Sequence, residues 1–365
     1  MPHPGGDRVP AFTPEELYKL VDEVLPCMNS YMAHQRSRYP AMRRLRHAPV
    51  YRPLLDLATM EDRHIIQTYH LNRKTTMDLC TQLEPDHTPV IRNPYDIPPT
   101  VQVLSVLHFL ATGSFQNTVA LTAGMPQPMF SLVLKDVLYA LLKHLDGYIW
   151  VPERAHLAYL KADFYDMGHI PHVIGAMDGT HRALVPPSAN EQVYRNRKNY
   201  HSINVQVVCL ADQYISQVRA KFQGSVNDSY ILRNSNVPHM MAHYTQRGLG
   251  SECVTLPRKM TSFFNEAHIR MKRVMERTFG FVKARFRCLD ASGGALFYSS
   301  QKACQIIVAS CMLHNVALRR QIPLLADDDE AAGPVTGNVD MESDEEADEE
   351  GAADSKTELN NHYFQ

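Results

Sequence analysis

The chain has 365 residues, of which 44% are hydrophobic, and a formal net charge of −2. This is enough apolar material for two globular domains, while the longest apolar runs fall far short of the roughly 20 residues that span a bilayer. Seven scattered cysteines form no disulfide framework, so we expect an intracellular protein.

Residues 1–52 are predicted to form a basic flexible arm. Six arginines in its second half are consistent with a solvated surface and equally with contacts to phosphates or a nuclear import signal. They are Arg36, Arg38, Arg43, Arg44, Arg46 and Arg52.

Residues 53–150 predict an all-helical domain. Within it, the segment 114–121 is followed by a short turn that contains Gly124, and a longer helix begins near Pro126. This layout is typical of a helix-turn-helix, although packing hairpins share it. The second helix carries few basic residues, so direct contact with DNA bases and a packing role remain equally open.

A proline-rich passage over 151–185 is predicted to lead from helices to strands. The first strand is expected at 173–177, and alternating apolar residues predict two more at 203–209 and 218–222. Helices are predicted over 228–234, 263–287 and 300–319. Strands followed by helices indicate an α/β layer fold.

Three acidic residues stand out in this second part of the chain. Asp178 ends the first strand and precedes Gly179, an arrangement found in metal-dependent phosphoryl-transfer sites and also in ordinary turns. Asp228 is either a site residue or the N-cap of the next helix. Glu276 lies off the apolar stripe of its helix, beside Lys272, either on a solvated face or on a strip that a DNA phosphate approaches.

Basic residues accompany these acids. Arg195, Arg197 and Lys198 alternate with aromatic and amide residues in Tyr194–His201, which favours contact with nucleic acid over a plain surface loop. One stripe of the predicted helix 263–287 carries several charged residues. It consists of Lys272, Glu276, Gly280, Lys283 and Arg287. Cys304, Cys311 and His314 also share a helical face, where a buried core helix is a better explanation than a zinc site.

Several blocks resemble the PIF/Harbinger transposases and the harbinger transposase-derived nucleases domesticated from them, which are DDE superfamily endonucleases. The blocks are Ala176–His181, Tyr194–Lys198, Tyr200–Gln206, Gly224–Ser225 with Asp228–Ser229, Asn265–His268, Glu276–Gly280, Lys283–Arg287 and Met312–Asn315. They occur in the expected order between about residues 69 and 318.

The resemblance implies a ribonuclease H-like nuclease core over 165–322, preceded by the helical domain. It implies that Asp178, Asp228 and Glu276 are catalytic and bind divalent metal cations, Mg²⁺ or Mn²⁺. It also implies hydrolysis of DNA phosphodiester bonds, a Myb-like DNA-binding partner, and localisation in the nucleus with the cytoplasm as a second compartment. The expected DNA contacts are Arg195, Arg197, Lys198, Lys272, Lys283 and Arg287.

The chain departs from this family at 240–262. Relatives carry there an apolar strand that ends in Gly-Asp-x-x-Tyr/Phe, whereas the only acidic residue of this stretch is Glu252. We therefore expect an internal strand and one acidic ligand to be missing, with weak activity and marginal stability as consequences. A DNA- or protein-binding module without cleavage is the alternative function.

The last segment, 326–365, is predicted to be an acidic disordered tail. From Asp327 to Glu358 there are 14 acidic residues and one lysine, which leaves 36 basic and 25 acidic residues, a net charge of +11, in residues 1–326. A body of that charge suggests a polyanionic partner such as DNA.

Overall fold

The structure is a computed structural model that describes residues 57–87, 97–150, 152, 154–187, 190–235, 237–238, 252–255, 262–290 and 294–324. The predicted basic arm over 1–52 and the acidic tail over 326–365 lie outside these residues. Within the described residues, no helix combines the length and apolar character needed to cross a membrane.

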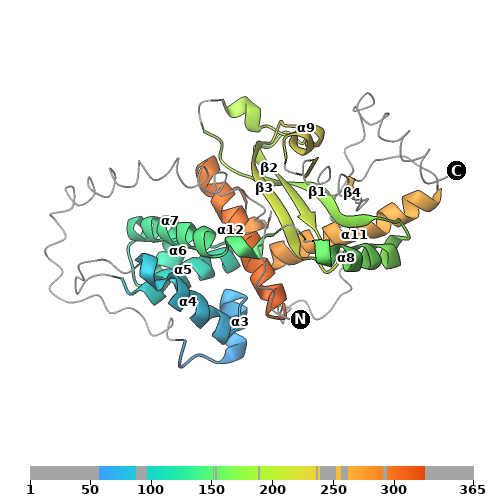
Figure 1. The fold of residues 1–365 in the computed structure, drawn as a ribbon. Helices are drawn as coiled ribbons and strands as arrows, with labels where there is room; N and C mark the ends of the chain where they lie inside the picture. The colour runs from blue at the N-terminus through green and yellow to red at the C-terminus, as the bar shows by residue number, and fades with distance from the viewer. Residues whose placement is uncertain are drawn as a thin grey trace, which may run out of the picture.

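A group of helices forms the first part of the chain, at the left of Figure 1. Pro99 begins one of them and Gly113, with φ 67°, ends it, because proline suits the first helical turn and glycine the left-handed position after the last. The helices are α3 (Asp62–Tyr69), α4 (Arg73–His87), α5 (Pro99–Thr112), α6 (Gln116–Ala123) and α7 (Gln127–His144), followed by the short 3-10 helix η3 (Asp146–Tyr148).

A four-stranded sheet forms the centre of the second part, with the strand order β3-β2-β1-β4. The strands are β1 (Val173–Ala183), β2 (Ser202–Cys209), β3 (Ile215–Gln223) and β4 (Glu252–Thr255). Both β1 with β2 and β2 with β3 pair antiparallel, whereas β4 pairs parallel to β1. The protein is therefore an α/β protein with a small mixed sheet.

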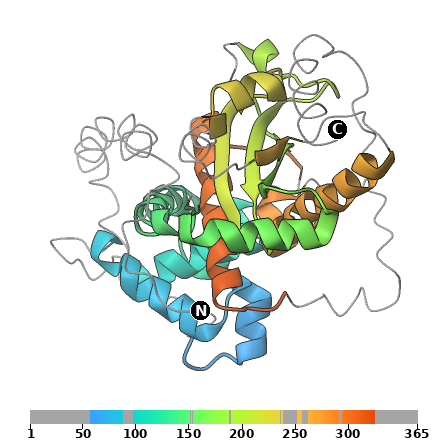
Figure 2. The same cartoon turned by 45° about the vertical axis from the view of Figure 1, so that its right-hand side comes forward.

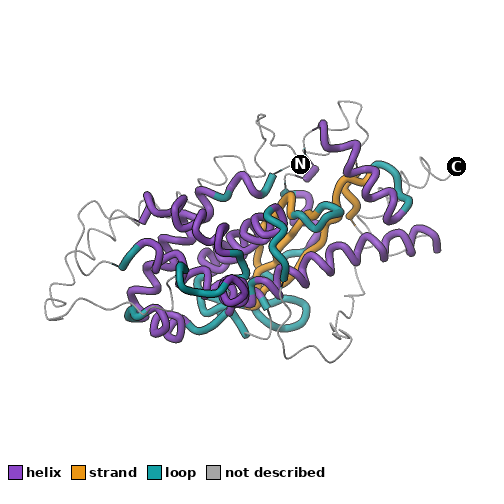
Figure 3. The backbone as a smooth tube through the Cα atoms, turned by 90° about the horizontal axis from the view of Figure 1, so that it is seen from below, coloured by secondary structure: helices purple, strands orange, loops and turns teal. Residues whose placement is uncertain are grey.

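Helices surround this sheet, as Figure 3 shows from below. They are α8 (Arg154–Gly168), α9 (Asp228–Arg233), α11 (Ser262–Arg285) and α12 (Ser300–Arg319), with 3-10 helices η4 (Glu191–Tyr194) and η5 (Arg287–Leu289). Helix α11 packs on β1 and β2, and α8 packs on β1 and α11. Figures 1 and 2 place α9 and α8 at opposite ends of the strands.

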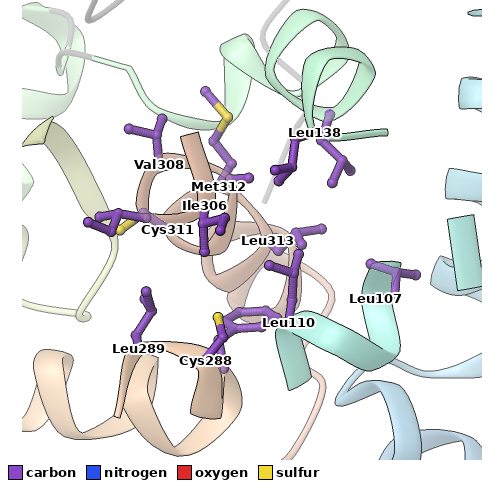
Figure 4. Packing of buried hydrophobic residues seen from close by; sticks show 14 of the residues in the cluster. Leu107, Leu110, Leu138, Cys288, Leu289, Ile306, Val308, Cys311, Met312 and Leu313 are labelled. Carbon is purple, nitrogen blue, oxygen red and sulfur yellow. The ribbon is translucent and has the colours of Figure 1, made fainter. Parts of the chain in front are cut away.

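Helix α12 joins the two parts, because it packs on α7 from one side and on β3 from the other. Every described residue from Ala303 to Ala317 is buried, and one hydrophobic cluster extends from Leu57 to Ile322. Figure 4 shows Leu313 of α12 near Leu110 of α5. The helices and the sheet therefore share one core.

A buried arginine strengthens this junction. Arg285, at the end of α11, donates hydrogen bonds to the carbonyl oxygens of His70 (2.8 Å) and Ile322 (2.9 Å). Two carbonyl acceptors on one guanidinium satisfy part of its donor fork and tie together segments far apart in the sequence. This contact holds α11, which carries Glu276, in a fixed position relative to the rest of the core.

Most predicted elements are confirmed, with β2, α9, α11 and α12 within two residues of their expected bounds. Two predictions are wrong. The passage 151–185 contains helix α8 before its strand, because Leu157, Leu160 and Phe164 form a buried helical stripe. The first strand, expected to end at residue 177, continues to Ala183 because pairing with β2 continues, so Asp178 lies within β1. A short strand, β4, pairs with Val173–Met177 of β1 inside the segment 240–262. The loss of the family's Gly-Asp strand and its acidic ligand stays a prediction.

Candidate metal and nucleic-acid site

Asp178 follows the buried residues of β1 and lies opposite Val207 of β2. Its Oδ1 accepts a hydrogen bond from the Gly179 backbone N–H at 2.8 Å. Burial raises the pKa of this carboxyl group to about 6, although the Gly179 hydrogen bond opposes the shift. The strand therefore holds a carboxylate in surroundings that disfavour its charge.

Asp228 is the first residue of α9. The N-cap of that helix is Asn227, so the alternative of Asp228 as the N-cap is wrong. Asp228 Oδ1 instead accepts a hydrogen bond of 2.8 Å from the side-chain amide of Asn204 on β2. This bond fixes the Asp228 carboxylate against β2, the strand that pairs with the strand of Asp178.

Gly179 allows this close approach. A Cβ atom at position 179 would lie 2.9 Å from Asp228 Oδ1 and 3.3 Å from Asn204 Oδ1. The first distance is shorter than real Cβ contacts, so a larger residue would displace the carboxylate. Because Gly179 has no side chain, Asp228 Oδ1 and Asn204 Oδ1 can both lie close to its backbone.

Glu276 lies on the exposed side of α11, while Met271 and Met275 of the same helix are buried. The Lys272 Nζ atom lies 3.9 Å from Glu276 Oε1. Both side chains act on Asp178: Glu276 raises the pKa of its carboxyl group and Lys272 lowers it. The structure therefore brings Glu276 within electrostatic range of the Asp178 carboxylate.

The same is true of Asp228, whose charge also raises the Asp178 pKa. Three acids from β1, α9 and α11 thus share one electrostatic environment. In the described part of the chain, no three His, Cys, Asp or Glu side chains converge closely enough to form a metal-binding group by themselves. The donors present at the sheet end are carboxylate and amide oxygens, which are the hard ligands that Mg²⁺ and Mn²⁺ take.

A short basic loop lies next to Asp228. Its buried residue Asn196 accepts hydrogen bonds from the backbone N–H groups of Lys198 (3.0 Å) and Tyr200 (3.2 Å). Arg195, Arg197 and Lys198 are exposed, and Arg197 donates to Asn227 Oδ1 at 3.4 Å. The loop therefore presents three cations beside the N-terminus of α9.

The remaining predicted DNA contacts are distributed differently. Lys272 is half-buried beside Glu276, and Lys283 is half-buried, with a pKa lowered by burial. Helix α11 ends at Arg285, so Arg287 belongs to η5 rather than to the predicted helical stripe. Of this group, Lys272 is the cation that acts on Asp178.

The two other predicted features prove to be parts of the core. Cys304, Cys311 and His314 are at most 7% exposed, and burial raises the pKa of both thiols to about 12. Helices α6 and α7 occupy the segments where two helices were expected, and α7 packs on α4, α5, α6 and α12. Core packing is enough to explain this pair of helices. A helix-turn-helix arrangement that binds DNA stays a prediction.

The sequence did not single out Asn204 as a functional residue. Asn204 and Gln206 alternate with apolar residues of β2, a pattern typical of a strand with one solvated face. Both are instead buried, Asn204 with 1% exposure. The available signal was Gly179, because a residue without a side chain leaves room for a polar contact. Sequence spacing alone does not connect Gly179 to a residue of β2.

Comparisons with known proteins identify a family and several relatives. A model of the DDE superfamily endonuclease family matches residues 177–315, a range that includes all three acids. A Bos taurus protein named "Putative nuclease HARBI1" is 34% identical over 265 residues, which cover 68% of this chain and 74% of the relative.

The Homo sapiens protein of the same name is 30% identical over 305 residues, covering 80% of this chain and 86% of the relative. An Arabidopsis thaliana "Protein ALP1-like" is 22% identical over 294 residues, or 71% of each chain. No solved structure matches this chain.

Proposed function

This chain belongs to the harbinger transposase-derived nucleases of the DDE endonuclease superfamily, and from that membership we propose that it is a divalent-metal-dependent DNA endonuclease. Its site would consist of Asp178, Asp228 and Glu276. DNA is the substrate that a nuclease of this family implies.

The sheet supports a ribonuclease H-like core for this nuclease. Its order is β3-β2-β1-β4, with β4 parallel to β1 and the other pairs antiparallel. The first acid lies on the central strand β1 and the last on α11, which packs against that strand. Fold alone does not establish function, so the site has to carry the proposal.

The observation that carries it is the effect of Asp228 and Glu276 on Asp178. Both raise the pKa of a carboxyl group that is already disfavoured by burial. Like charges held together by a fold repel one another, and a bound cation relieves that repulsion. Asp178 and Asp228 would hold the cation with oxygen ligands, and Glu276 would approach it from α11.

When bound, a divalent cation supplies Lewis acidity toward a phosphodiester oxygen and lowers the pKa of an attacking water. The protein's own contribution is to position the three carboxylates. Arg195, Arg197 and Lys198 would hold flanking phosphates of the DNA by charge, and Lys272 would approach the strand beside Glu276. The Myb-like partner and the nuclear localisation stay predictions.

Nicking of supercoiled plasmid tests this proposal. The full chain is incubated with plasmid in Mg²⁺, Mn²⁺ or EDTA, beside the Asp178→Ala variant. We expect relaxed circles in the presence of either cation, none in EDTA, and a loss of at least about a hundredfold in Asp178→Ala, because that variant removes a central ligand.

Asp212→Asn is the control, since Asp212 is an exposed aspartate in the turn between β2 and β3, whose side chain accepts a hydrogen bond from the Tyr214 backbone N–H. It should retain nicking. Equal nicking by the wild-type chain and Asp178→Ala would point to a contaminating nuclease. DNA binding without any metal-dependent nicking would favour a binding module over an endonuclease.

A further inference from the structure

The solvent face of α11 carries three arginines that the proposed site does not use. Arg270, Arg273 and Arg277 follow one another at intervals of three and four residues, and all three are exposed. Residues with that spacing lie on one side of a helix, so the three side chains form a row, the arginine stripe. At about 100° per residue, these positions lie roughly 60–120° around the helix from Glu276. The stripe is therefore a surface beside the acids rather than part of their site.

The arginine stripe has an excess of positive charge. Among the α11 side chains that the structure describes, Glu276 is the one acid, and it pairs with Lys272. Within the described residues, neither Arg273 nor Arg277 has an acidic group at ion-pair distance. Arg277 Nε instead donates to the Arg273 carbonyl oxygen at 3.4 Å. Two like charges one turn apart repel each other, and a bound anion relieves that repulsion.

The chain leaves the described fold beside the C-terminal end of α11. Arg285, the last residue of that helix, donates a hydrogen bond of 2.9 Å to the Ile322 carbonyl oxygen, and the described chain ends two residues later. At 1.5 Å per residue, the stripe lies about 12–22 Å along the helix from this contact. An extended chain covers up to about 3.6 Å per residue, so the acids of 327–330 can reach Arg277. Those of 340–350 can reach the whole stripe.

The segment that follows Ile322 has the charge that the stripe lacks. Residues 327–358 contain 14 acids and one lysine. Guanidinium groups bind carboxylates through paired hydrogen bonds, and a covalently attached partner acts at an effective concentration of the order of millimolar. The basic loop with Arg195, Arg197 and Lys198 is less accessible to this segment. It lies beside α9, at the opposite end of the sheet from the end of α12 (Figures 1 and 2).

We propose that the acidic segment 327–358 docks on the arginine stripe of α11 in the same chain. Its carboxylates pair with the guanidinium groups of Arg270, Arg273 and Arg277 and cover the solvent face of the helix that carries Glu276. The contact itself requires neither metal nor DNA. If the proposed function holds, DNA that approaches α11 has to displace the segment, and the contact is then autoinhibitory.

Zero-length crosslinking of the full chain tests this contact. A carbodiimide activates a carboxylate, and a lysine amine then displaces the activating group to form an amide bond, whereas arginine does not react. The test variant is therefore Arg273→Lys with Arg277→Lys. The matched control is Arg319→Lys with Arg320→Lys, which places two exposed lysines at the end of α12, closer to the start of the acidic segment.

Both variants are crosslinked at low salt without DNA or metal, and the linked peptides of the monomer are quantified by mass spectrometry. We expect at least about fivefold more links from positions 273 and 277 to acids of 327–358 than from positions 319 and 320. Raising the salt concentration from about 50 to 500 mM should reduce this excess severalfold, because salt screens contacts between exposed charges. Circular dichroism should show the same helix content for both variants.

An equal or larger yield at positions 319 and 320 would overturn the docking, because an undocked segment meets those lysines first. The same result is expected if the stripe binds only DNA. Links confined to covalent dimers would also overturn it, since they would assign the contact to a second copy. If the double variant does not fold, Arg273→Lys alone is compared with Arg320→Lys. Nicking plays no part in this measurement, so its outcome is independent of the proposed nuclease activity.

Discussion

A carboxylate with a raised pKa makes the folded protein less stable once it ionises. Asp178 has a folded pKa of about 6, above the 3.8 of an unperturbed aspartate, because it is buried and close to Asp228 and Glu276. The folded state therefore holds this proton more tightly than the unfolded chain does. The free energy of unfolding falls as pH rises from about 4 to 6 and stays reduced above that range.

This predicts that Asp178→Asn stabilises the protein while removing its proposed activity. At pH 7.5 in EDTA, the gain in the free energy of unfolding should be about 1–3 kcal/mol, since each pKa unit corresponds to about 1.4 kcal/mol. Most of the gain should disappear by pH 4, where the wild-type carboxyl is protonated in the folded state. Urea denaturation at the two pH values measures it.

The control is Asp166→Asn, an exposed aspartate on α8. This variant should change the unfolding free energy little at either pH. A destabilised Asp178→Asn variant at pH 7.5 would show that the Asp178 carboxylate is favourable in the metal-free fold. The electrostatic description of the site would then be wrong.

At the scale of elements, the basic loop depends on a close approach at Gly224. A Cβ there would overlap Ser202 Oγ and lie 2.5 Å from the Tyr194 carbonyl oxygen. Gly224→Ala should therefore lower the free energy of unfolding by about 1–3 kcal/mol. Gly280→Ala has nothing within 4 Å and lies inside α11, so it should raise stability by up to about 1 kcal/mol.

Urea denaturation measures whether Gly224→Ala lowers and Gly280→Ala raises the free energy of unfolding. Equal effects of the two substitutions would mean that the loop tolerates a shift at Gly224. In that case the loop would not be held rigidly against the end of the sheet, and its alignment with Asp228 would need another cause.

The exposed cations of this loop predict a salt effect on DNA binding. Changing Arg195, Arg197 and Lys198 together to Ala should reduce the slope of log K against log salt by about 2–3, because each phosphate contact releases roughly 0.7–0.9 of a counterion. Fluorescence anisotropy with labelled DNA measures this slope.

The matched control removes Arg63, Lys74 and Arg320, three exposed cations on α3, α4 and the end of α12. The net charge is then the same as in the loop variant. If both triple variants change the slope equally, DNA senses the overall charge, and the loop is not the contact surface.

The sequence predicted most of the elements that have one apolar face. Helix α11 is an example, because Met271, Met275 and Val282 repeat with helical spacing and are buried. Helix α8 was overlooked although its buried stripe has the same spacing, since the prolines around it suggested strands. Strand β4 has only four residues, and its place comes from pairing with β1, a long-range contact that no local pattern encodes.

Among the residues of the site, too, some follow from local patterns in the sequence and others only from long-range contacts. Asp178 is recognisable because it directly follows the apolar run Val173–Met177, and Glu276 because it lies off an apolar stripe. Asn204 is not, because its role depends on burial beneath other segments and on the approach of Asp228, which lies 24 residues away in the sequence. Tertiary contacts, rather than strand periodicity, make this residue part of the site.

For the whole molecule, charge is divided between the body and the tail. Residues 1–326 carry a net charge of +11, while the tail from Asp327 to Glu358 carries 14 acidic residues and one lysine. Opposite charges on one chain compete with an external polyanion for the same surface. Deleting residues 327–365 should therefore tighten DNA binding, most clearly at low salt.

Anisotropy titrations at about 50 and 200 mM salt compare the full chain with the truncated one. The difference in affinity should shrink at the higher salt concentration. Equal affinities at both concentrations would show that the tail does not compete with DNA.

The central claim is that Asp178, Asp228 and Glu276 belong to one cation site. Anomalous X-ray diffraction from crystals soaked in Mn²⁺ tests it most directly. We expect a peak about 2.0–2.3 Å from carboxylate oxygens of both Asp178 and Asp228, with Glu276 facing the same site. A Mn²⁺ peak elsewhere, or the three carboxylates ordered toward separate surfaces, would contradict the account.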